Sequence, residues 1–338
     1  MRIGIMSFAH LHAESYIHNL KSIVGVEVIG FSDTDPVRGD RASREYESRW
    51  FPEHEALLAE RPDAVLICSE NANHRELVEL AAAAGVHVLC EKPIEVSCES
   101  ARAMREVCDR AGVHFMTAFP MRFDVNIRAA REVMARGELG EVYAINGVNH
   151  SENPYRHRAW FAQQALAGGG AVMDHTVHLL DLYRWFLGSE VVEVYAEVGN
   201  PFYPDEIDVD SAGLVTLTFE TGVFASIDCS WSRPTSYPRF GHLKMELFGD
   251  RGALSVDAFA QHLRVWSGAL ERTPSWIGWG DNPDLAMIKA FVASVREDRE
   301  PPVTWRDGYE ALRVALACYQ SAERGEPVAL GSPPEGEG

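Results

Sequence analysis

Short apolar runs alternate with longer amphipathic stretches over the first 120 residues. The runs lack polar alternation, as is typical of strands covered on both faces, and helix-length segments separate them. Strands connected in this way pair in parallel. The predicted strands are 3–6, 26–31, 64–68, 86–90 and 113–118, and the predicted helices are 10–22, one from about Pro36, 73–84 and 97–111.

The pattern changes after Arg122, where most strand-like segments follow one another and the turns between them, such as Glu220-Thr221-Gly222, are typical of antiparallel hairpins. We expect an α/β chain with an N-terminal Rossmann-type, doubly wound parallel sheet (1–120), a C-terminal α+β domain with a large, mostly antiparallel sheet (121–330), and a disordered tail (331–338). The predicted strands are 142–148, 191–198, 213–219, 223–229, 244–248, 253–256 and 263–266, and the predicted helices are 124–136, 171–187, 283–297 and 305–324.

Composition and charge narrow the possible partners. The chain has 338 residues, 46% of them hydrophobic, and a formal net charge of −19. An acidic surface repels phosphates and anionic lipids, so neither nucleic acid nor membrane is an expected partner. No apolar run is long enough to cross a bilayer, and the N-terminus does not resemble a signal peptide, so we expect a cytoplasmic protein. The six cysteines form no CxxC pair and no compact zinc pattern, and no metal site is predicted.

The turn after the first predicted strand departs from the dinucleotide-binding pattern GxGxxG. It contains Ser7-Phe8-Ala9-His10-Leu11-His12, so all three glycines are missing. Two interpretations compete: the following helix still offers its N-terminus to a diphosphate, or the site has lost its nucleotide. His10 and His12 could contact a phosphate, although packing roles are commoner for such histidines.

Asp33 ends the second predicted strand, where a carboxylate accepts hydrogen bonds from the adenosine ribose and repels a 2′-phosphate. It favours NAD over NADP. Its alternative role is to cap the turn Asp33-Thr34-Asp35-Pro36.

Two further motifs contain candidate catalytic groups. Glu91-Lys92-Pro93 follows a predicted parallel strand, so the Lys92 ammonium can stabilise an anionic substrate oxygen beyond the end of the sheet. A glycine run, Gly168-Gly169-Gly170, precedes a helix on which Asp174 and His178 share a face, with Asp181 on the same side. An imidazole held by a carboxylate suits proton transfer near neutral pH.

Together these motifs resemble those of the glucose–fructose oxidoreductase / inositol dehydrogenase / rhizopine catabolism (Gfo/Idh/MocA) family. Weaker matches are Arg122-Phe123 and the turn Gly137-Glu138-Leu139-Gly140-Glu141-Val142, and the resemblance covers nearly the whole chain. Besides the glycines, Ser69-Glu70-Asn71 is a departure, because the family usually has Thr-Pro-Asn there. Glu70 could weaken nucleotide binding.

The resemblance implies an NAD-dependent oxidoreductase that acts on a sugar, inositol or related polyol, as a homodimer or homotetramer associated through the C-terminal sheet. Its implied catalytic groups are Lys92, Asp174 and His178, with His178 as the base and Lys92 opposite the developing alkoxide. The implied cofactor-binding residues are Ser7, Phe8, Ala9, His10, Leu11, Asp33, Ser69, Asn71, His74, Glu91 and Lys92. The implied substrate-binding residues are Lys92, Arg122, Tyr155, Arg156, Trp160, Asp174 and His178.

Two other functions stay open at this point. A non-catalytic sensor would keep the fold and bind dinucleotide or sugar without turnover, and the missing glycines favour it, whereas the retained Lys92, Asp174 and His178 oppose it. NAD-dependent glycoside cleavage through transient oxidation is the other alternative.

Overall fold

The computed structural model describes residues 1–269, 273–280 and 282–331, so the predicted tail lies almost wholly outside the described residues. The chain forms two compact units. Unit 1 contains Met1–Pro120, Ala165–Gly168 and Asp284–Leu312, and unit 2 contains Met121–Gln164, Gly169–Pro283 and the chain from Arg313. The chain therefore returns to unit 1 twice after first leaving it.

Unit 1 is built on a six-stranded parallel sheet with the order β3-β2-β1-β4-β5-β6. This is the doubly wound order, in which the direction of winding reverses between β1 and β4. The three central strands β1, β4 and β5 are almost completely buried, which explains their unbroken apolar sequences. The strands are β1 (Arg2–Met6), β2 (Glu27–Ser32), β3 (Trp50–Phe51), β4 (Ala64–Ile67), β5 (His87–Cys90) and β6 (Phe115–Thr117).

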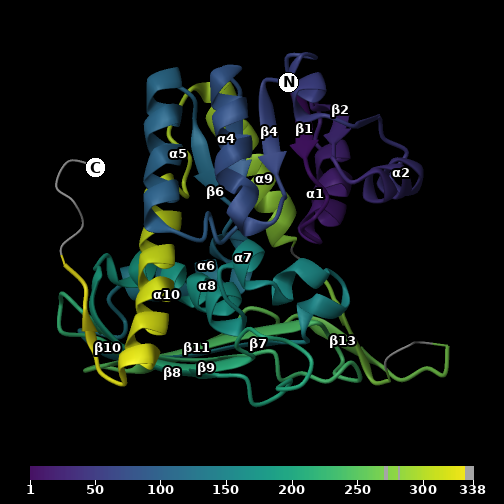
Figure 1. The fold of residues 1–338 in the computed structure, drawn as a ribbon. Coiled ribbons are helices and arrows are strands. Elements are labelled where there is room, and N and C mark those ends of the chain that lie inside the picture. The colour runs from purple at the N-terminus through teal and green to yellow at the C-terminus, as the bar shows by residue number, and fades with distance from the viewer. Residues whose placement is uncertain (270–272, 281, 332–338) are drawn as a thin grey trace. The chain divides into compact units, whose positions relative to one another are not determined.

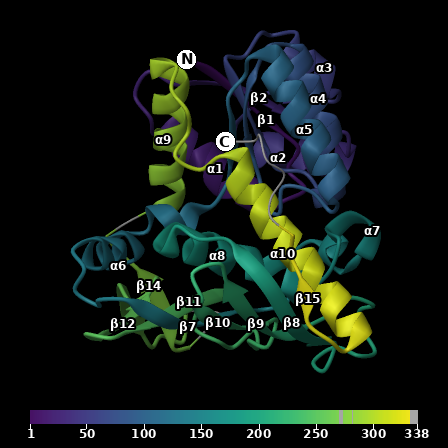
Figure 2. The same cartoon turned by 90° about the vertical axis from the view of Figure 1, so that its left-hand side faces the viewer.

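Helices cover both faces of this sheet, and Figure 2 shows α4 and α5 side by side on one of them. Local signals define their ends: Ser97 caps α5 by accepting a hydrogen bond from the Ser100 N–H, and Asp35 caps α2, which has Pro36 in its first turn. The helices are α1 (His12–Lys21), α2 (Pro36–Glu45), α3 (His54–Leu58), α4 (His74–Ala83), α5 (Cys98–Ala111), α9 (Pro283–Glu297) and the first part of α10 (Trp305–Arg324).

Unit 2 is built on a seven-stranded sheet with the order β12-β11-β7-β10-β9-β8-β15. All neighbours pair antiparallel except β7 and β10, which are parallel. The predicted hairpin turns join β9 to β10 and β11 to β12. The strands are β7 (Val142–Ser151), β8 (Val191–Gly199), β9 (Ala212–Phe219), β10 (Phe224–Ser230), β11 (Gly241–Gly249), β12 (Ala253–Asp257) and β15 (Val328–Ala329); β13 (His262–Val265) and β14 (Ser275–Gly278) pair separately.

One long helix, α8 (Ala171–Leu187), lies along one face of the unit 2 sheet (Figure 1). It is buried along most of its length, and its contacts are with the central strands β7, β9 and β10. The other helices are α6 (Val125–Ala135), α7 (Gln164–Ala167) and the short 3₁₀ turns η1 (Asn71–Asn73), η2 (Pro120–Phe123), η3 (Pro154–Arg156) and η4 (Ala159–Ala162).

The predicted fold class is confirmed: a parallel Rossmann sheet precedes a mostly antiparallel one. The elements that the sequence did not predict are short, such as the two-residue strands β3 and β15, whose identity depends on a neighbouring strand. Among the described residues, no helix is both long and apolar enough to span a bilayer.

Candidate active site

The carboxyl ends of four strands bring the predicted cofactor residues of unit 1 to one edge of its sheet. The chain leaves β1 at Ser7, β2 at Asp33, β4 near Ser69, and β5 at Glu91 and Lys92. Because these strands are parallel and adjacent, residues that are up to 85 positions apart become neighbours. The sequence-predicted cofactor set of unit 1 is therefore assembled at the usual ligand edge of such a sheet.

Ser7 adopts the backbone conformation for which other sequences use glycine. Its φ is +70°, in the left-handed region that non-glycine residues rarely occupy. Its N–H donates to the Ser32 carbonyl at 2.7 Å, and its Oγ accepts from the Ala9 N–H at 3.1 Å. The tight turn after β1 is thus retained without glycine, and the serine hydroxyl offsets part of the conformational cost.

Most backbone donors of this turn are already used within the chain. The Phe8 N–H donates to Asp33 Oδ2 at 2.8 Å, the His10 N–H to the Cys68 carbonyl at 2.8 Å, and the His12 N–H to His10 Nδ1 at 3.2 Å. Phe8 itself is buried, with its ring 4.5 Å from that of Phe31. The turn therefore presents few of the free N–H groups that a glycine-rich loop offers to a diphosphate.

Asp33 is completely buried and held by four donors. Arg38 donates to both carboxylate oxygens, through Nε at 2.7 Å and Nη2 at 2.9 Å, and the N–H groups of Phe8 and Asp35 also donate to them. A ribose hydroxyl could reach this carboxylate only by displacing one of these donors. Sequence reasoning identified Asp33 but missed Arg38. The feature that could have revealed Arg38 is its position five residues after Asp33, in the first turn of α2.

Arg38 lies among several carboxylates. Besides Asp33, its Nη1 is 3.8 Å from Glu70 Oε1 and 3.9 Å from Asp35 Oδ2. The guanidinium is thus outnumbered by acidic groups. Glu70, the residue that departs from the family pattern, is one of them.

The predicted cofactor residues that follow β4 form hydrogen bonds with other groups of the chain. Ser69 donates to the Glu70 carbonyl at 3.1 Å, and Asn71 Nδ2 donates to the Ala167 carbonyl at 2.9 Å. His74, at the start of α4, is fully buried; its Nδ1–H donates to the Ile94 carbonyl at 3.1 Å, and burial lowers its pKa. His74 therefore supports the loop that follows Lys92.

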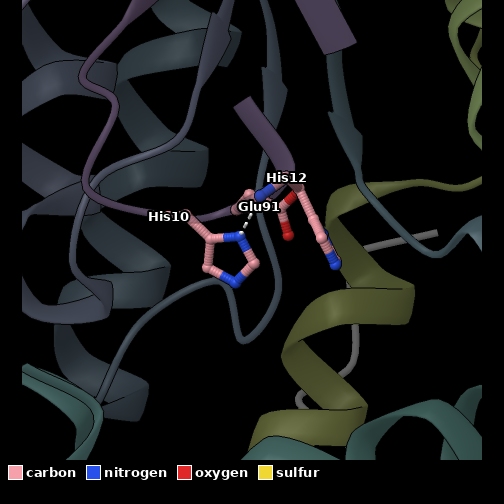
Figure 3. A group of neighbouring side chains, drawn as sticks. All are labelled: His10, His12 and Glu91. Atoms are coloured by element: carbon pink, nitrogen blue, oxygen red, sulfur yellow. Dashed lines mark hydrogen bonds and ion pairs between the residues drawn. The ribbon is translucent and has the colours of Figure 1, made fainter. Parts of the chain in front are cut away.

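A cluster of His10, His12 and Glu91 lies at this edge (Figure 3). Glu91 is buried, its Oε1 is 3.0 Å from His12 Nδ1, and its Oε2 accepts from the Lys92 N–H at 3.1 Å. Burial tends to raise the Glu91 pKa, but the nearby His12 and His10 hold it well below its ordinary value. Sequence reasoning did not connect these residues, because Glu91 follows His12 by 79 positions.

In unit 2, the glycine run and a half-buried carboxylate position the first turn of α8. Asp210 accepts from the N–H groups of Gly170 and Val172, both at 2.7 Å, and from the Tyr319 hydroxyl at 2.8 Å. A Cβ on Gly170 would lie 1.8 Å from the Asp210 carbonyl oxygen, so only glycine allows this approach. Burial raises the pKa of Asp210, against the lowering effect of its hydrogen bonds. Sequence reasoning missed Asp210, which is forty residues from the helix it caps.

Asp174 and His178 lie one turn apart on α8, as predicted. Asp174 Oδ2 accepts a hydrogen bond from Trp231 Nε1 at 3.2 Å. Trp231 is fully buried in an apolar cluster against which Tyr155 and Tyr203 pack. The arrangement puts the Asp174 carboxylate beside Trp231, and sequence reasoning had identified Tyr155 but neither Trp231 nor Tyr203.

The remaining predicted substrate residues pack within unit 2. The Tyr155 hydroxyl donates to Glu206 Oε2 at 2.6 Å, and the Arg156 guanidinium lies 6.0 Å from the Tyr203 ring. Trp160 is buried and stacks on Phe161 at 4.0 Å.

Arg122 forms a buried, bidentate ion pair with Asp181. Its Nε donates to Oδ2 at 2.8 Å and its Nη2 to Oδ1 at 2.6 Å. The pair joins the start of the second unit's sequence to the middle of α8. The guanidinium of Arg122 and the carboxylate of Asp181 are both buried and bonded to each other. Asp181 therefore differs in environment from Asp174 on the same helix.

A dinucleotide fits the edge of the unit 1 sheet on chemical grounds. The N-terminus of α1, the partly exposed His12 and the neighbouring Lys92 supply positive charge for a diphosphate. The turn at Ser7 keeps the left-handed backbone conformation for which glycine-rich turns use glycine. Lys92 belongs to unit 1, and Asp174 and His178 belong to unit 2.

Comparisons with known proteins agree with this chemistry. Residues 2–119 match the model of an oxidoreductase family with an NAD-binding Rossmann fold, and residues 127–255 match the GFO/IDH/MocA C-terminal domain. The myo-inositol 2-dehydrogenase of Thermotoga maritima is 29% identical, over 98% of each chain. The D-apiose dehydrogenase of Paraburkholderia graminis is 28% identical, over 97% of this chain and 88% of that protein. The crystal structure of myo-inositol 2-dehydrogenase from Lactobacillus plantarum is similar with a TM-score of 0.85, at 25% identity over 98% and 99% of the two chains.

The close approach at Gly170 leads to a test of how the α8 site is built. We expect Gly170→Ala to lower the free energy of unfolding by about 1–3 kcal/mol, because its Cβ would overlap the Asp210 backbone. Thermal or urea unfolding measures the change. The matched control is Gly199→Ala, whose Cβ would meet its nearest atom only at 4.0 Å. Equal unfolding midpoints for the two variants would contradict this account of the glycine run.

Proposed function

This chain belongs to the GFO/IDH/MocA family of NAD-binding oxidoreductases, and from that premise we propose that it oxidises a ring hydroxyl of an inositol, sugar or similar polyol. The observation that carries the proposal is the presence, in one chain, of Lys92 at the ligand edge of the Rossmann sheet and of Asp174 and His178 at the start of α8. The names of the relatives, an inositol dehydrogenase and a sugar dehydrogenase, support the same substrate class.

In the proposed reaction the chain's own residues handle the proton and the charge. His178 accepts the hydroxyl proton, and Lys92 stabilises the oxygen as negative charge develops on it. Asp174 orients the substrate, and its carboxylate is itself held by Trp231. A bound NAD would supply the hydride acceptor for this reaction.

We further propose that the protein prefers NAD to NADP because a group of carboxylates, and not Asp33 alone, repels a 2′-phosphate. Asp33 is covered by Arg38, so its role is indirect. The carboxylates of Asp33, Asp35 and Glu70 surround a single guanidinium, and the local charge is net negative. A 2′-phosphate would enter this acidic group of residues and be repelled.

For assembly, we propose association through the face of the unit 2 sheet that α8 does not cover. Alternate residues of β9 and β10 point to that face, and among them Leu214 and Phe224 are 56% and 58% exposed. Large apolar side chains on an open sheet face are typical of a subunit interface.

The catalytic proposal predicts a loss of kcat in two variants. Once an active substrate is found, Lys92→Ala and His178→Ala should each lower kcat at least about a hundredfold, because each group acts mainly in the transition state. Binding of NAD should be largely kept, and the double variant should lose much less than the product of the two effects.

Matched controls are available on exposed surfaces of unit 1. Lys289→Ala removes an exposed lysine and His18→Ala an exposed histidine, and both should leave kcat unchanged. If either catalytic variant keeps near-wild-type kcat, the assigned roles are wrong.

Cofactor preference is testable without a substrate. Calorimetric titration should show NAD binding about tenfold or more tightly than NADP, as expected for a repelled phosphate. Replacing two of the carboxylates, in Asp35→Asn with Glu70→Gln, should narrow the ratio, whereas Asp40→Asn on the exposed side of α2 should not. Equal affinities in the wild type would refute the acidic-surroundings argument.

The assembly proposal predicts an oligomer at micromolar concentration by light scattering. Phe224→Glu should shift it toward monomer, because a charge would be buried in the interface. Val24→Glu, at a 92% exposed apolar position of unit 1, is the matched control and should not change the mass. A monomeric wild type would rule the proposal out.

A further inference from the structure

The binding of a dinucleotide diphosphate poses a specific problem in this chain. Glycine-rich turns bind phosphates through free backbone N–H groups. Here the N–H groups of Phe8, Ala9, His10 and His12 are each donated to an acceptor within the protein. If the protein binds NAD, as the proposed function requires, side chains have to supply what the backbone does not.

His12 occupies the place where such a side chain is needed. It is the first residue of α1, a helix of ten residues, and it stands where the third glycine of the usual pattern would be. Its side chain is 26% exposed, whereas that of Glu91 behind it is fully buried (Figure 3). With Nδ1 directed to Glu91 at 3.0 Å, Nε2 is the ring nitrogen that can meet a ligand.

The Glu91 carboxylate makes a proton on His12 favourable. Burial has the largest single effect on the pKa of His12, and it lowers that pKa. The charge of Glu91 and the hydrogen bond to it together outweigh burial, so the pKa is raised overall. The imidazole is thus held as an imidazolium to a higher pH than an ordinary histidine. The ionisable groups around it are Glu91, Asp284 at the start of α9, Lys92, His10 and Tyr16.

A metal ion is the competing occupant, because the ligand atoms of His10, His12 and Glu91 lie within 4.8 Å of one another. The hydrogen bonds oppose it. The Nδ1 lone pair of His10 accepts a hydrogen bond from the His12 N–H. The proton of a neutral His10 ring is therefore on Nε2, and neither nitrogen offers a free lone pair. The Glu91 oxygens face His12 Nδ1 and the Lys92 N–H. A metal would have to replace these contacts beside a lysine ammonium.

We propose that the His12 imidazolium, backed by the Glu91 carboxylate, is the group that binds the diphosphate of the dinucleotide in place of the glycine-rich loop. The pair works as a unit: Glu91 orients the ring through Nδ1, and Nε2–H donates to a phosphate oxygen. The positive end of α1 adds to the same field. Cofactor binding in this protein therefore depends on one proton.

The test is calorimetric titration of the full-length protein with NAD, ADP-ribose and adenosine across pH 5.5–8.5. Affinity for NAD and ADP-ribose should be highest at low pH and fall as pH rises above the ordinary histidine value of 6.5, because binding favours the protonated ring. Adenosine, which lacks phosphate, should show no such fall. Titrations in two buffers of different ionisation enthalpy should show net proton uptake on NAD binding within this pH window.

Variants of His12 separate charge from shape. His12→Gln should bind NAD about tenfold or more weakly at pH 6, as expected for a lost charged hydrogen bond, and its affinity should not vary with pH. His12→Lys should restore affinity and also be independent of pH. Glu91→Gln should shift the pH dependence to lower pH, if that variant folds, and His18→Gln on the same helix is the matched control.

Different failures have different meanings. A wild type that binds none of the dinucleotides would overturn the proposed function itself. A wild type that binds NAD with the same affinity and pH profile as His12→Gln would overturn this inference alone. Stoichiometric metal in the purified protein, lost in His12→Gln, would also overturn it, because a ligating nitrogen cannot hold the proton.

Discussion

The buried carboxylate of Glu91 is the constraint on which the cofactor edge depends. An ionised carboxylate out of water costs several kcal/mol unless donors surround it. Here the donors are the Lys92 N–H and the His12 ring, and nearby histidines hold the Glu91 pKa low despite burial. The need to satisfy one charge thus orients the first turn of α1 and the loop that carries Lys92. The contacts that stabilise the buried Glu91 carboxylate therefore also position the candidate functional residues His12 and Lys92.

A second, half-buried carboxylate has the corresponding role in unit 2. Asp210 accepts hydrogen bonds from N–H groups at the start of α8. Glycines are needed before this helix because the Asp210 backbone and the Tyr319 ring lie too close to them to leave room for side chains. The helix end that carries Asp174 is therefore held from another segment of the chain, not by a local cap. Arg122 and Asp181 secure the helix further along. Each candidate catalytic region thus contains an ion pair with a buried carboxylate, His12 with Glu91 in unit 1 and Arg122 with Asp181 in unit 2.

Asp33 shows how a motif residue can keep its place while its partner changes its role. Its position at the end of β2 agrees with the usual ribose-binding carboxylate, but Arg38 covers both of its oxygens. Selectivity for a cofactor then depends on the balance of charge among Asp33, Asp35, Glu70 and Arg38. A single residue read from the sequence could not reveal that balance.

The sequence by itself determined the fold class, the long helices and the candidate catalytic residues. Helices α8, α9 and α10 have the bounds predicted for them, because periodicity and the flanking glycine or proline are local properties. The motif around Lys92 and the spacing of Asp174 and His178 are local in the same sense. Only the tertiary structure decided that Arg38 covers Asp33, that Asp210 caps α8 and that Glu91 holds His12. These contacts join residues that sequence spacing does not relate, and strand order and helix packing bring them together.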